Sequence, residues 1–212
     1  MPKIVDHDER RREVLSAAGR VIVRDGIDAA TTRAIAKEAG YSNGVLAHYF
    51  TDKDEILLSA LRQSHQRIRA RLTGKVTDAG GPGGSALAAL RELLLDNLPL
   101  DDERARETRL EVSFWSRSLA SERLAGVQRG EAGELRAAVR DLLGRARAAG
   151  ELRNSAAPDS PAAHDPHTDE LDDHAEHLLA LMDGLSLHLL LYPERLTRAD
   201  AERVMLRALD RL

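Results

Sequence analysis

Histidine and aspartate side chains gather in one part of this sequence, and together they could bind a metal ion. His174 and His177 are spaced i, i+3, so both imidazoles could face one ion from one side of a helix. The alternative is a polar linker that leads into the solvated start of a helix, and we favour it. We therefore predict no metal and no cofactor. The residues of this cluster are His164, Asp165, His167, Asp169, Asp172, Asp173, His174 and His177.

Other patterns that would indicate an enzyme are missing from the sequence. The glycine-rich stretch GGPGGS at 80–85 is not a phosphate-binding loop, which needs G-x-x-x-x-G-K-[ST] directly before a helix. No nucleophile–base pair and no cofactor motif is present, and the absence of cysteine rules out disulfides and thiolate metal sites. We therefore expect a protein that is not an enzyme.

The stretch 31–50, TTRAIAKEAGYSNGVLAHYF, reads as two short helices joined by a tight turn. Thr31 or Thr32 can cap the first helix and Ser42 the second, because a hydroxyl accepts a hydrogen bond from a free N–H of the opening turn. Gly40 suits the positive φ at a helix end. This spacing predicts a helix-turn-helix, whose second helix enters the DNA major groove; the alternative is an ordinary αα-hairpin. The buried sides are Ile35, Ala36 and Ala39, then Val45, Leu46 and Tyr49.

The surroundings of this motif favour DNA binding. A helix precedes it, and SNGVLAHYFTDKDEIL follows the turn with Ser-x-Gly, HYF and Asp-Lys. Residues 9–72 thereby resemble the TetR family of one-component transcriptional regulators. The remainder resembles the ligand-binding half of that family, in particular the branch named for the betaine-pathway repressor. That second resemblance rests on Trp115 with its neighbours, on LLGRARAAGEL and on LLALMDGLSLHLLLYPERLT.

The resemblance implies which residues face DNA. At the first motif helix these are Thr31, Thr32 and Arg33, and at the next helix start Lys53 matches a backbone-contacting lysine. Asn43 is the best base reader by its chemistry, since an amide can pair with adenine. Ala47 stands where many members have a tyrosine, so that phosphate contact is absent. The exposed face of the second helix is Ser42, Asn43, Gly44, Ala47, His48 and Tyr49; Gly44 would let the main chain approach DNA, and His48 and Tyr49 suit phosphate contacts.

The charge of the chain is unevenly distributed. The formal net charge is −4, yet residues 1–72 carry 13 Lys and Arg against 10 Asp and Glu. The positive excess therefore lies with the motif, where phosphates would be neutralised. Arg10 or Arg11 could touch the DNA backbone, the alternative being a solvated helix face. The opening residues do not form a secretory signal and no apolar run of about eighteen residues could span a membrane, so we expect a cytoplasmic protein.

Hydrophobic periodicity predicts an all-α fold, because no strand pattern appears. We expect an N-terminal helix-turn-helix head of three helices and a C-terminal helical domain for ligand binding and dimerisation. The head covers 1–53, with a linking helix at 54–72 that carries His65 in its core stripe. The second domain covers 73–212 and contains a flexible insertion at 154–168. Helices are expected at 8–25, 51–72, 85–98, 101–119, up to 149 with a break near 126–133, 170–192 and 197–212.

A small-molecule pocket is expected in the second domain. Phe114, Trp115 and Tyr192 are the only aromatic residues outside the head, and they are either core residues or the lining of an effector pocket. The branch name points to choline, but a cage for a quaternary ammonium usually needs several aromatic faces, so choline is not favoured. The candidate pocket residues are Leu110, Phe114, Trp115, Met182 and His188.

The stretch from Leu178 to Leu191 is apolar nearly all round, which is more surface than one small core can use. We therefore expect a homodimer in which the last two helices form a four-helix bundle across a two-fold axis. The interface residues would be Leu178, Leu181, Leu185, Leu189, Val204, Met205 and Leu209.

Taken with the family resemblance, these patterns indicate a ligand-responsive DNA-binding transcriptional regulator. The resemblance implies a repressor that binds double-stranded DNA at a palindromic operator as a homodimer and is released by a small-molecule effector. The alternative is an all-α small-molecule or metal-binding sensor that uses the cluster between His164 and His177.

Overall fold

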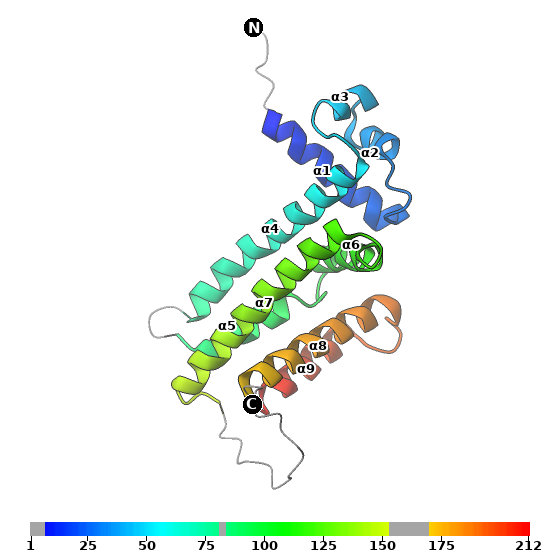
Figure 1. Ribbon diagram of the computed structural model, residues 1–212. Helices are drawn as coiled ribbons and strands as arrows, with labels where there is room; N and C mark the ends of the chain where they lie inside the picture. Colours follow the sequence, from blue (N-terminus) through cyan, green and yellow to red (C-terminus); the bar gives the residue numbers. More distant parts are fainter. Residues whose placement is uncertain (1–6, 81–83, 153–169) are drawn as a thin grey trace. The chain divides into compact units, whose positions relative to one another are not determined.

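The computed structural model describes residues 7–80, 84–152 and 170–212, and in these ranges the chain forms helices and no strand (Figure 1). The prediction of an all-α fold is confirmed. No helix of the described ranges is long and apolar enough to cross a membrane. The helices are α1 His7–Asp25, α2 Thr32–Ala39, α3 Asn43–Ala47, α4 Lys53–Gly80, α5 Ala86–Asp96, α6 Asp102–Ser118, α7 Glu122–Ala148, α8 Glu170–Leu191 and α9 Arg198–Leu209.

These helices form two compact units, and the units do not follow the division at residue 73 that the sequence predicts. The N-terminal unit comprises Met1–Ile68 and Arg109–Gln128, and the second unit comprises Arg69–Thr108 and Arg129–Leu212. Helices α4, α6 and α7 therefore contribute residues to both units. The division differs because the second half of α6 and the start of α7 belong to the hydrophobic core of the N-terminal unit, through Leu110, Phe114 and Leu124.

The core of the N-terminal unit is built mainly on α1, α2 and the first half of α4. Helix α1 buries one stripe of apolar residues at 3.6-residue spacing and ends at Gly26, which has a φ of 88°. His65 of α4 is only 8% exposed, and its Nε2 lies 2.8 Å from Oε2 of Glu111 on α6. His65 thus lies in the core, as its place in the apolar stripe predicts. Fully buried members of this core include Val14, Val21, Ile22, Ile35, Leu57, Leu61 and Phe114.

The second unit packs α5, the later part of α7, α8 and α9 around another apolar core. A buried ion cluster adds to it: Asp96 of α5 is 3% exposed and accepts hydrogen bonds from Arg71 at 2.8 Å and from Lys75 at 2.5 Å. Arg71 also donates two parallel hydrogen bonds to Glu107 on α6. The apolar core includes Leu90, Leu94, Leu98, Val139, Leu143, Leu178, Ala201 and Met205.

One helix runs further than the sequence predicts, and another lacks the predicted break. Helix α4 continues past Leu72 to Gly80, and α7 runs unbroken through Gly126, Gly130 and Gly133. A glycine inside a helix costs only about 0.5–1 kcal/mol relative to alanine, so single glycines among good helix formers are tolerated. The expected insertion at 154–168 lies outside the described residues.

Candidate nucleic-acid interface

The first helix of the motif, α2, is fixed at both ends by its own sequence. Of the two threonines that could cap it, Thr31 does so: its Oγ1 accepts a hydrogen bond from the N–H of Ala34 at 3.1 Å. Gly40 ends the helix with a φ of 75°, where its N–H reaches the last carbonyls. Ile35 and Ala36 are buried against the core, which leaves Thr31 and Arg33 exposed.

The second helix of the motif, α3, presents a polar face to solvent. Ser42 caps it as expected, since its Oγ accepts from the N–H of Val45 at 3.3 Å. Leu46 is 2% exposed and anchors the helix to the core. The helix is shorter than predicted: His48 is its C-cap, and Tyr49 lies beyond it. The exposed residues are Ser42, Asn43, Gly44, Ala47 and His48.

Gly44 occupies an ordinary helical position on α3. A Cβ built there would meet only Oγ of Ser42, at an ordinary contact distance of 3.8 Å. Nothing within the chain therefore requires glycine at this position. Its backbone conformation also makes no such demand, because φ is positive only at Gly26, Gly40 and Gly150 within the described residues.

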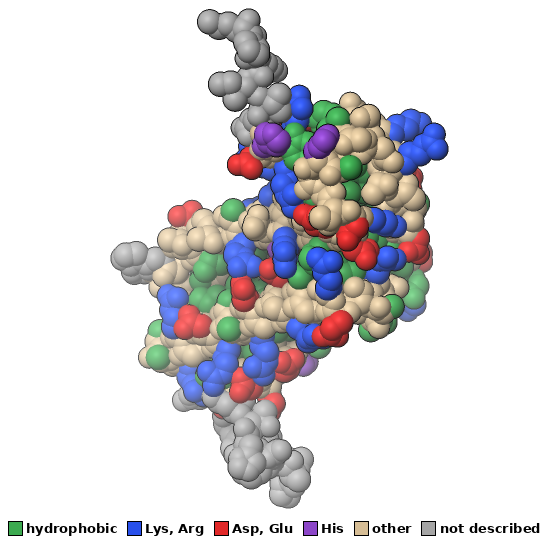
Figure 2. Space-filling model, turned by 45° about the horizontal axis from the view of Figure 1, so that its top comes forward, with side chains coloured by type: hydrophobic (Ala, Val, Ile, Leu, Met, Phe, Trp, Pro, Cys, Tyr) green, Lys and Arg blue, Asp and Glu red, His purple; other side chains and the backbone are tan. Residues whose placement is uncertain are grey.

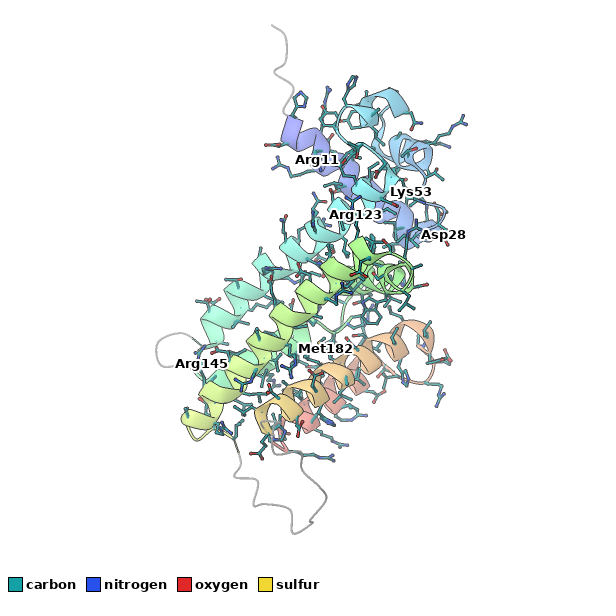
Figure 3. All side chains as sticks on the ribbon, in the orientation of Figure 1. Arg11, Asp28, Lys53, Arg123, Arg145 and Met182 are labelled. Carbon is teal, nitrogen blue, oxygen red and sulfur yellow. The ribbon has the colours of Figure 1, made fainter. Side chains whose placement is uncertain are left out.

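Lys53, at the start of α4, already has partners within the chain. Its Nζ lies 3.5 Å from the carbonyl oxygen of Ile27 and 3.4 Å from that of Asp28, both in the loop after α1 (Figure 3). These hydrogen bonds are long, so they are weak and can be exchanged for another acceptor. Lys53 is half-buried, and its expected contact with the DNA backbone stays a prediction.

The arginines of α1 differ in what they contact. Arg20 and Arg24 both bind Glu38 of α2, at 2.8 and 2.9 Å, and so fasten α1 to the motif. Hydrogen bonds from Arg20 and then Arg24 hold the pKa of Glu38 below its usual range. Arg10 lies over the ring of Tyr41, with 5.8 Å from its Cζ to the ring centroid. Lys and Arg side chains are mixed with Asp and Glu over the face drawn in Figure 2.

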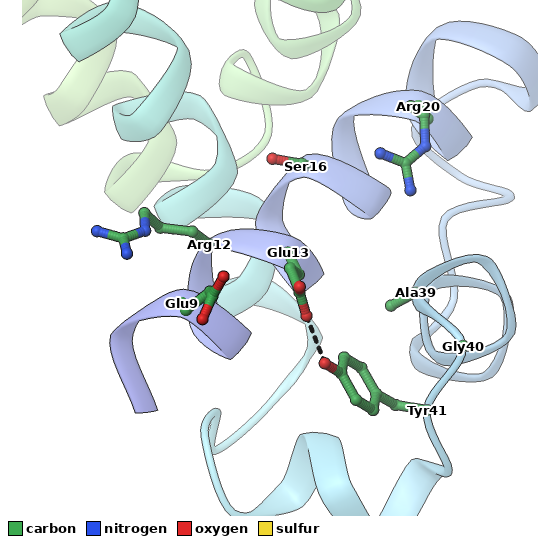
Figure 4. A pocket seen from close by; sticks show the side chains of 8 residues that line it. All are labelled: Glu9, Arg12, Glu13, Ser16, Arg20, Ala39, Gly40 and Tyr41. Atoms are coloured by element: carbon green, nitrogen blue, oxygen red, sulfur yellow. Dashed lines mark hydrogen bonds between the residues drawn. The ribbon is translucent and has the colours of Figure 1, made fainter. Parts of the chain in front are cut away.

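A shallow groove runs between α1 and the turn that leads into α3 (Figure 4). On its floor the hydroxyl of Tyr41 donates a hydrogen bond to Glu13. This bond, together with burial and the negative charge of Glu13, raises the pKa of Tyr41. The groove is lined on the α1 side by Glu9, Arg12, Glu13, Ser16 and Arg20.

The expected effector-pocket residues are divided between the two units. Leu110 and Phe114 are 5% and 0% exposed and serve the core of the N-terminal unit, where Trp115 is half-buried. Met182 is 6% exposed in the core of the second unit. His188 is exposed and lies edge-on to the ring of Tyr192, with centroids 5.5 Å apart. The core interpretation of Phe114 is thus the one that the structure favours.

Four of the seven expected interface residues belong to the core of a single chain. Their side chains are at most 7% exposed, so they have no surface left to bury against a second copy. The periodicity predicts apolar residues at these positions of α8 and α9, but their burial in the core of one chain contradicts the expectation that these four contact a second copy. Leu181, Leu189 and Val204 stay partly exposed. The core residues are Leu178, Leu185, Met205 and Leu209.

A different row of α8 faces away from this core. Its members are spaced i, i+4, i+7 and i+11 and therefore share one face. Leu191 is 60% exposed, and Tyr192 just beyond the helix is 41% exposed. The sequence does not separate the two faces of α8, because apolar residues lie on nearly every side of this stretch. The row is Ala180, Gly184, Leu187 and Leu191.

The histidine cluster is only partly described. His174 lies 3.8 Å from Glu170 one turn earlier on α8. Within the described ranges no group of three or more metal-ligating side chains is brought together. His164 and His167 lie outside these ranges, as do Asp165 and Asp169.

Two family models match the chain. Residues 14–60 match bacterial regulatory proteins of the tetR family, and residues 86–164 and 160–212 match the C-terminal region of the BetI-type transcriptional repressor. The HTH-type transcriptional regulator PksA of Bacillus subtilis (strain 168) is 30% identical over 210 residues, which cover 99% of this chain and 93% of PksA.

Solved structures agree with this fold. A transcriptional regulator from Rhodococcus sp. Rha1 has a TM-score of 0.76 at 27% identity, covering 94% of this chain and 93% of that one. A transcriptional regulator from Saccharomonospora viridis, solved in complex with choline, has a TM-score of 0.80 at 22% identity, covering 94% and 95%. The second likeness supports the fold alone.

A capped helix-turn-helix with a solvent-exposed second helix, joined to a helical body, defines a helix-turn-helix transcriptional regulator. The chain belongs to the tetR family of bacterial regulatory proteins and carries the BetI-type repressor region in its C-terminal part. Regulators of this family bind DNA and respond to ligands, so the predicted class of function is confirmed.

Proposed function

We propose that this protein represses transcription by binding a palindromic operator as a homodimer and leaves the operator when a small molecule binds to it. The observation that carries this proposal is α3, which is capped by Ser42, anchored by Leu46 and exposes Asn43, Ala47 and His48 to solvent. The apolar side of α3 is buried in the core. Its polar side is exposed and can contact base edges.

The outward face of α8 supports dimerisation. Ala180 and Gly184 are small and would let a second copy approach closely, while Leu187 and Leu191 supply apolar area. This row is the proposed interface, whereas Leu181, Leu189 and Val204 are partly buried against the core of the single chain. A two-fold axis would repeat each contact and would place two copies of α3 about 34–36 Å apart, one turn of DNA.

The effector is proposed to be a small molecule bound by the BetI-type region. Choline is a concrete first compound to test, because the regulator from Saccharomonospora viridis was solved with it. Trp115 is the sole tryptophan of the chain, so its fluorescence reports on one site. An effector lowers DNA affinity only if it binds more tightly to the conformation with low DNA affinity.

The test begins with a map of genomic DNA fragments bound by the purified protein. The recovered operator is then titrated at several salt concentrations, and candidate effectors are added while Trp115 emission is recorded. The proposal expects steep salt dependence, and it expects emission change and DNA release over the same effector concentrations. A protein that binds no DNA above random background at low salt would overturn the proposal. In that case zinc binding by equilibrium dialysis tests the sensor alternative.

A further inference from the structure

Arg11, on α1, reaches across to the corner where α3 ends and α4 begins (Figure 3). Its Nη1 donates to the carbonyl oxygen of Tyr49 at 2.6 Å. Its Nη2 lies 3.2 Å from both Oε1 of Glu55 and Oγ of Ser59 on α4. The guanidinium face also covers the ring of Phe50, with 4.4 Å from Cζ to the centroid. One side chain thus contacts the residues just after α3 and the first two turns of α4.

The partners of Arg11 are themselves fixed. Glu55 accepts hydrogen bonds from the N–H and the hydroxyl of Thr51, at 2.7 and 2.8 Å. These bonds, first that of the Thr51 N–H, hold the pKa of Glu55 below its usual range, so Glu55 stays a carboxylate near neutral pH. Phe50 is 5% exposed in the core. The corner therefore offers Arg11 a charged acceptor, a neutral carbonyl and an aromatic face in one place.

Such a set of partners suits arginine and no other cation. A guanidinium is planar, carries five N–H donors in a fixed fork and stacks on aromatic rings, whereas a lysine ammonium is a compact point charge. Both Nη atoms of Arg11 point to partners inside the chain. The Tyr49 carbonyl that it binds comes just after the C-cap of α3, where carbonyls lack helical partners.

We propose that Arg11 is a positioning residue for DNA recognition: it holds the carboxyl end of α3 against α1 and α4, so that α3 and His48 keep one orientation. It acts through Tyr49, Phe50 and Glu55 and does not contact phosphate. The inference rests on the proposed function for its DNA readout, while the contacts of Arg11 can be tested on the free protein.

The experiment compares Arg11→Lys with Arg12→Lys in the full-length protein. Arg12 is exposed on the same helix and has the same charge, so its substitution is the matched control. Operator DNA and random duplex DNA are each titrated at several salt concentrations, at a temperature where circular dichroism shows every variant to be folded. In parallel, ¹⁵N NMR records the Nη resonances of arginine in the wild-type protein, with the Arg11 signal assigned by its loss in Arg11→Lys.

We expect Arg11→Lys to lose about tenfold in operator affinity, because a point charge cannot replace the fork and the stacking. Its affinity for random DNA and its salt slope should match those of the wild type, and Arg12→Lys should keep the operator preference. Arg11 Nη signals should be resolved in the free protein, as expected for a guanidinium whose rotation is slowed, and should not shift when DNA is added.

Three results would overturn the proposal. Operator affinity of Arg11→Lys equal to that of the wild type would show that charge alone suffices. An equal loss on operator and random DNA with a flatter salt slope would make Arg11 a phosphate contact. Nη signals that appear only when DNA is added would also make Arg11 a phosphate contact. If Arg11→Lys does not fold, the Arg11 signals are assigned by comparison with Arg11→Gln instead. The Nη signals of the wild type then decide whether Arg11 is held by partners inside the chain. If the wild type binds no DNA, the proposed function fails, and the signals of the free protein still test the contacts of Arg11.

Discussion

The motif of the N-terminal unit and helix α8 of the second unit use their apolar side chains differently. In the motif, Ile35 and Leu46 are buried and the opposite side is polar. In α8, Leu178 is buried on one side, yet Leu187 and Leu191 lie on the other. A surface that meets nucleic acid needs exposed hydrogen-bonding groups, whereas one that meets a protein copy gains from exposed apolar area. The two helical surfaces thus indicate two kinds of partner.

The largest effect should separate the two faces of α8. Leu178→Asp places an unpaired carboxylate in the core, at a cost of several kcal/mol, and should unfold the second unit. Leu187→Asp should instead give monomers that remain helical and lose most operator affinity, since each head then holds only a half-site. Sedimentation and circular dichroism distinguish the two. Helical monomers from Leu178→Asp, with Leu187→Asp still dimeric at micromolar concentration, would reverse the assignment of the faces.

The second-largest effect is expected at the buried ion cluster of the second unit. Arg71→Met leaves Asp96, 3% exposed, with Lys75 as its remaining cation, and should cost about 3 kcal/mol of stability. Lys75→Met is the control and should cost less, because Lys75 is 44% exposed. Urea denaturation at neutral pH measures both. If the two variants lose equal stability, the Arg71 fork has no special role.

The same cluster predicts a pH dependence. Burial acts to raise the pKa of Asp96, but hydrogen bonds from Lys75 and Arg71 outweigh it, and the folded-state pKa lies below its usual range. A depressed pKa contributes stability above the unfolded value of about 3.9, and that stability is lost as the pH falls below it. Arg71→Met should therefore lose less stability than the wild type between pH 5 and pH 3, in the same urea assay.

The sequence predicted the head in detail because its local signals agree. Thr31 and Ser42 cap helices as expected, and Gly40 has the positive φ that its place required. The division of the units was not predictable, because the packing of Phe114 into the head core joins residues far apart in the chain. The contacts of Arg11 were missed for the same reason: periodicity places it on an outer face, and only the fold brings Tyr49 and Glu55 to it.

Asn43→Ala tests whether the exposed polar face of α3 reads bases. Asn43 is exposed at the first position of α3, and its amide can pair with a base edge. The substitution should cost about 1–3 kcal/mol of operator binding and relax the preference at one base position. Binding to a set of single-base operator variants measures this. An equal loss on every sequence would remove Asn43 from base readout.

Gly44→Ala gives a smaller effect with opposite signs on stability and binding. Since a Cβ there meets only Ser42 Oγ at 3.8 Å, the folded protein should gain up to about 0.5–1 kcal/mol from better helix propensity. Operator affinity should nevertheless fall if the main chain of α3 approaches DNA at this position. Thermal melts and operator titrations on one preparation suffice. Unchanged operator affinity would place Gly44 away from the DNA.

Lys53→Ala should have the smallest effect. Loss of one phosphate contact should weaken operator and random DNA alike and flatten the log–log salt slope by about 0.9. Its hydrogen bonds to the carbonyls of Ile27 and Asp28 are long, so little stability should be lost. A drop in melting temperature with an unchanged slope would show that Lys53 serves the loop after α1 instead.

The central claim is that two copies of α3 read one symmetric operator, and the genomic binding map tests it most directly. The map is made with the wild type, Asn43→Ala and Leu187→Asp under the same conditions. The wild type should enrich an inverted repeat whose half-sites are centred about one helical turn apart, or a multiple of it. Asn43→Ala should lose one base preference, and Leu187→Asp should enrich little. An enriched sequence without symmetry, recovered equally by all three proteins, would contradict the account.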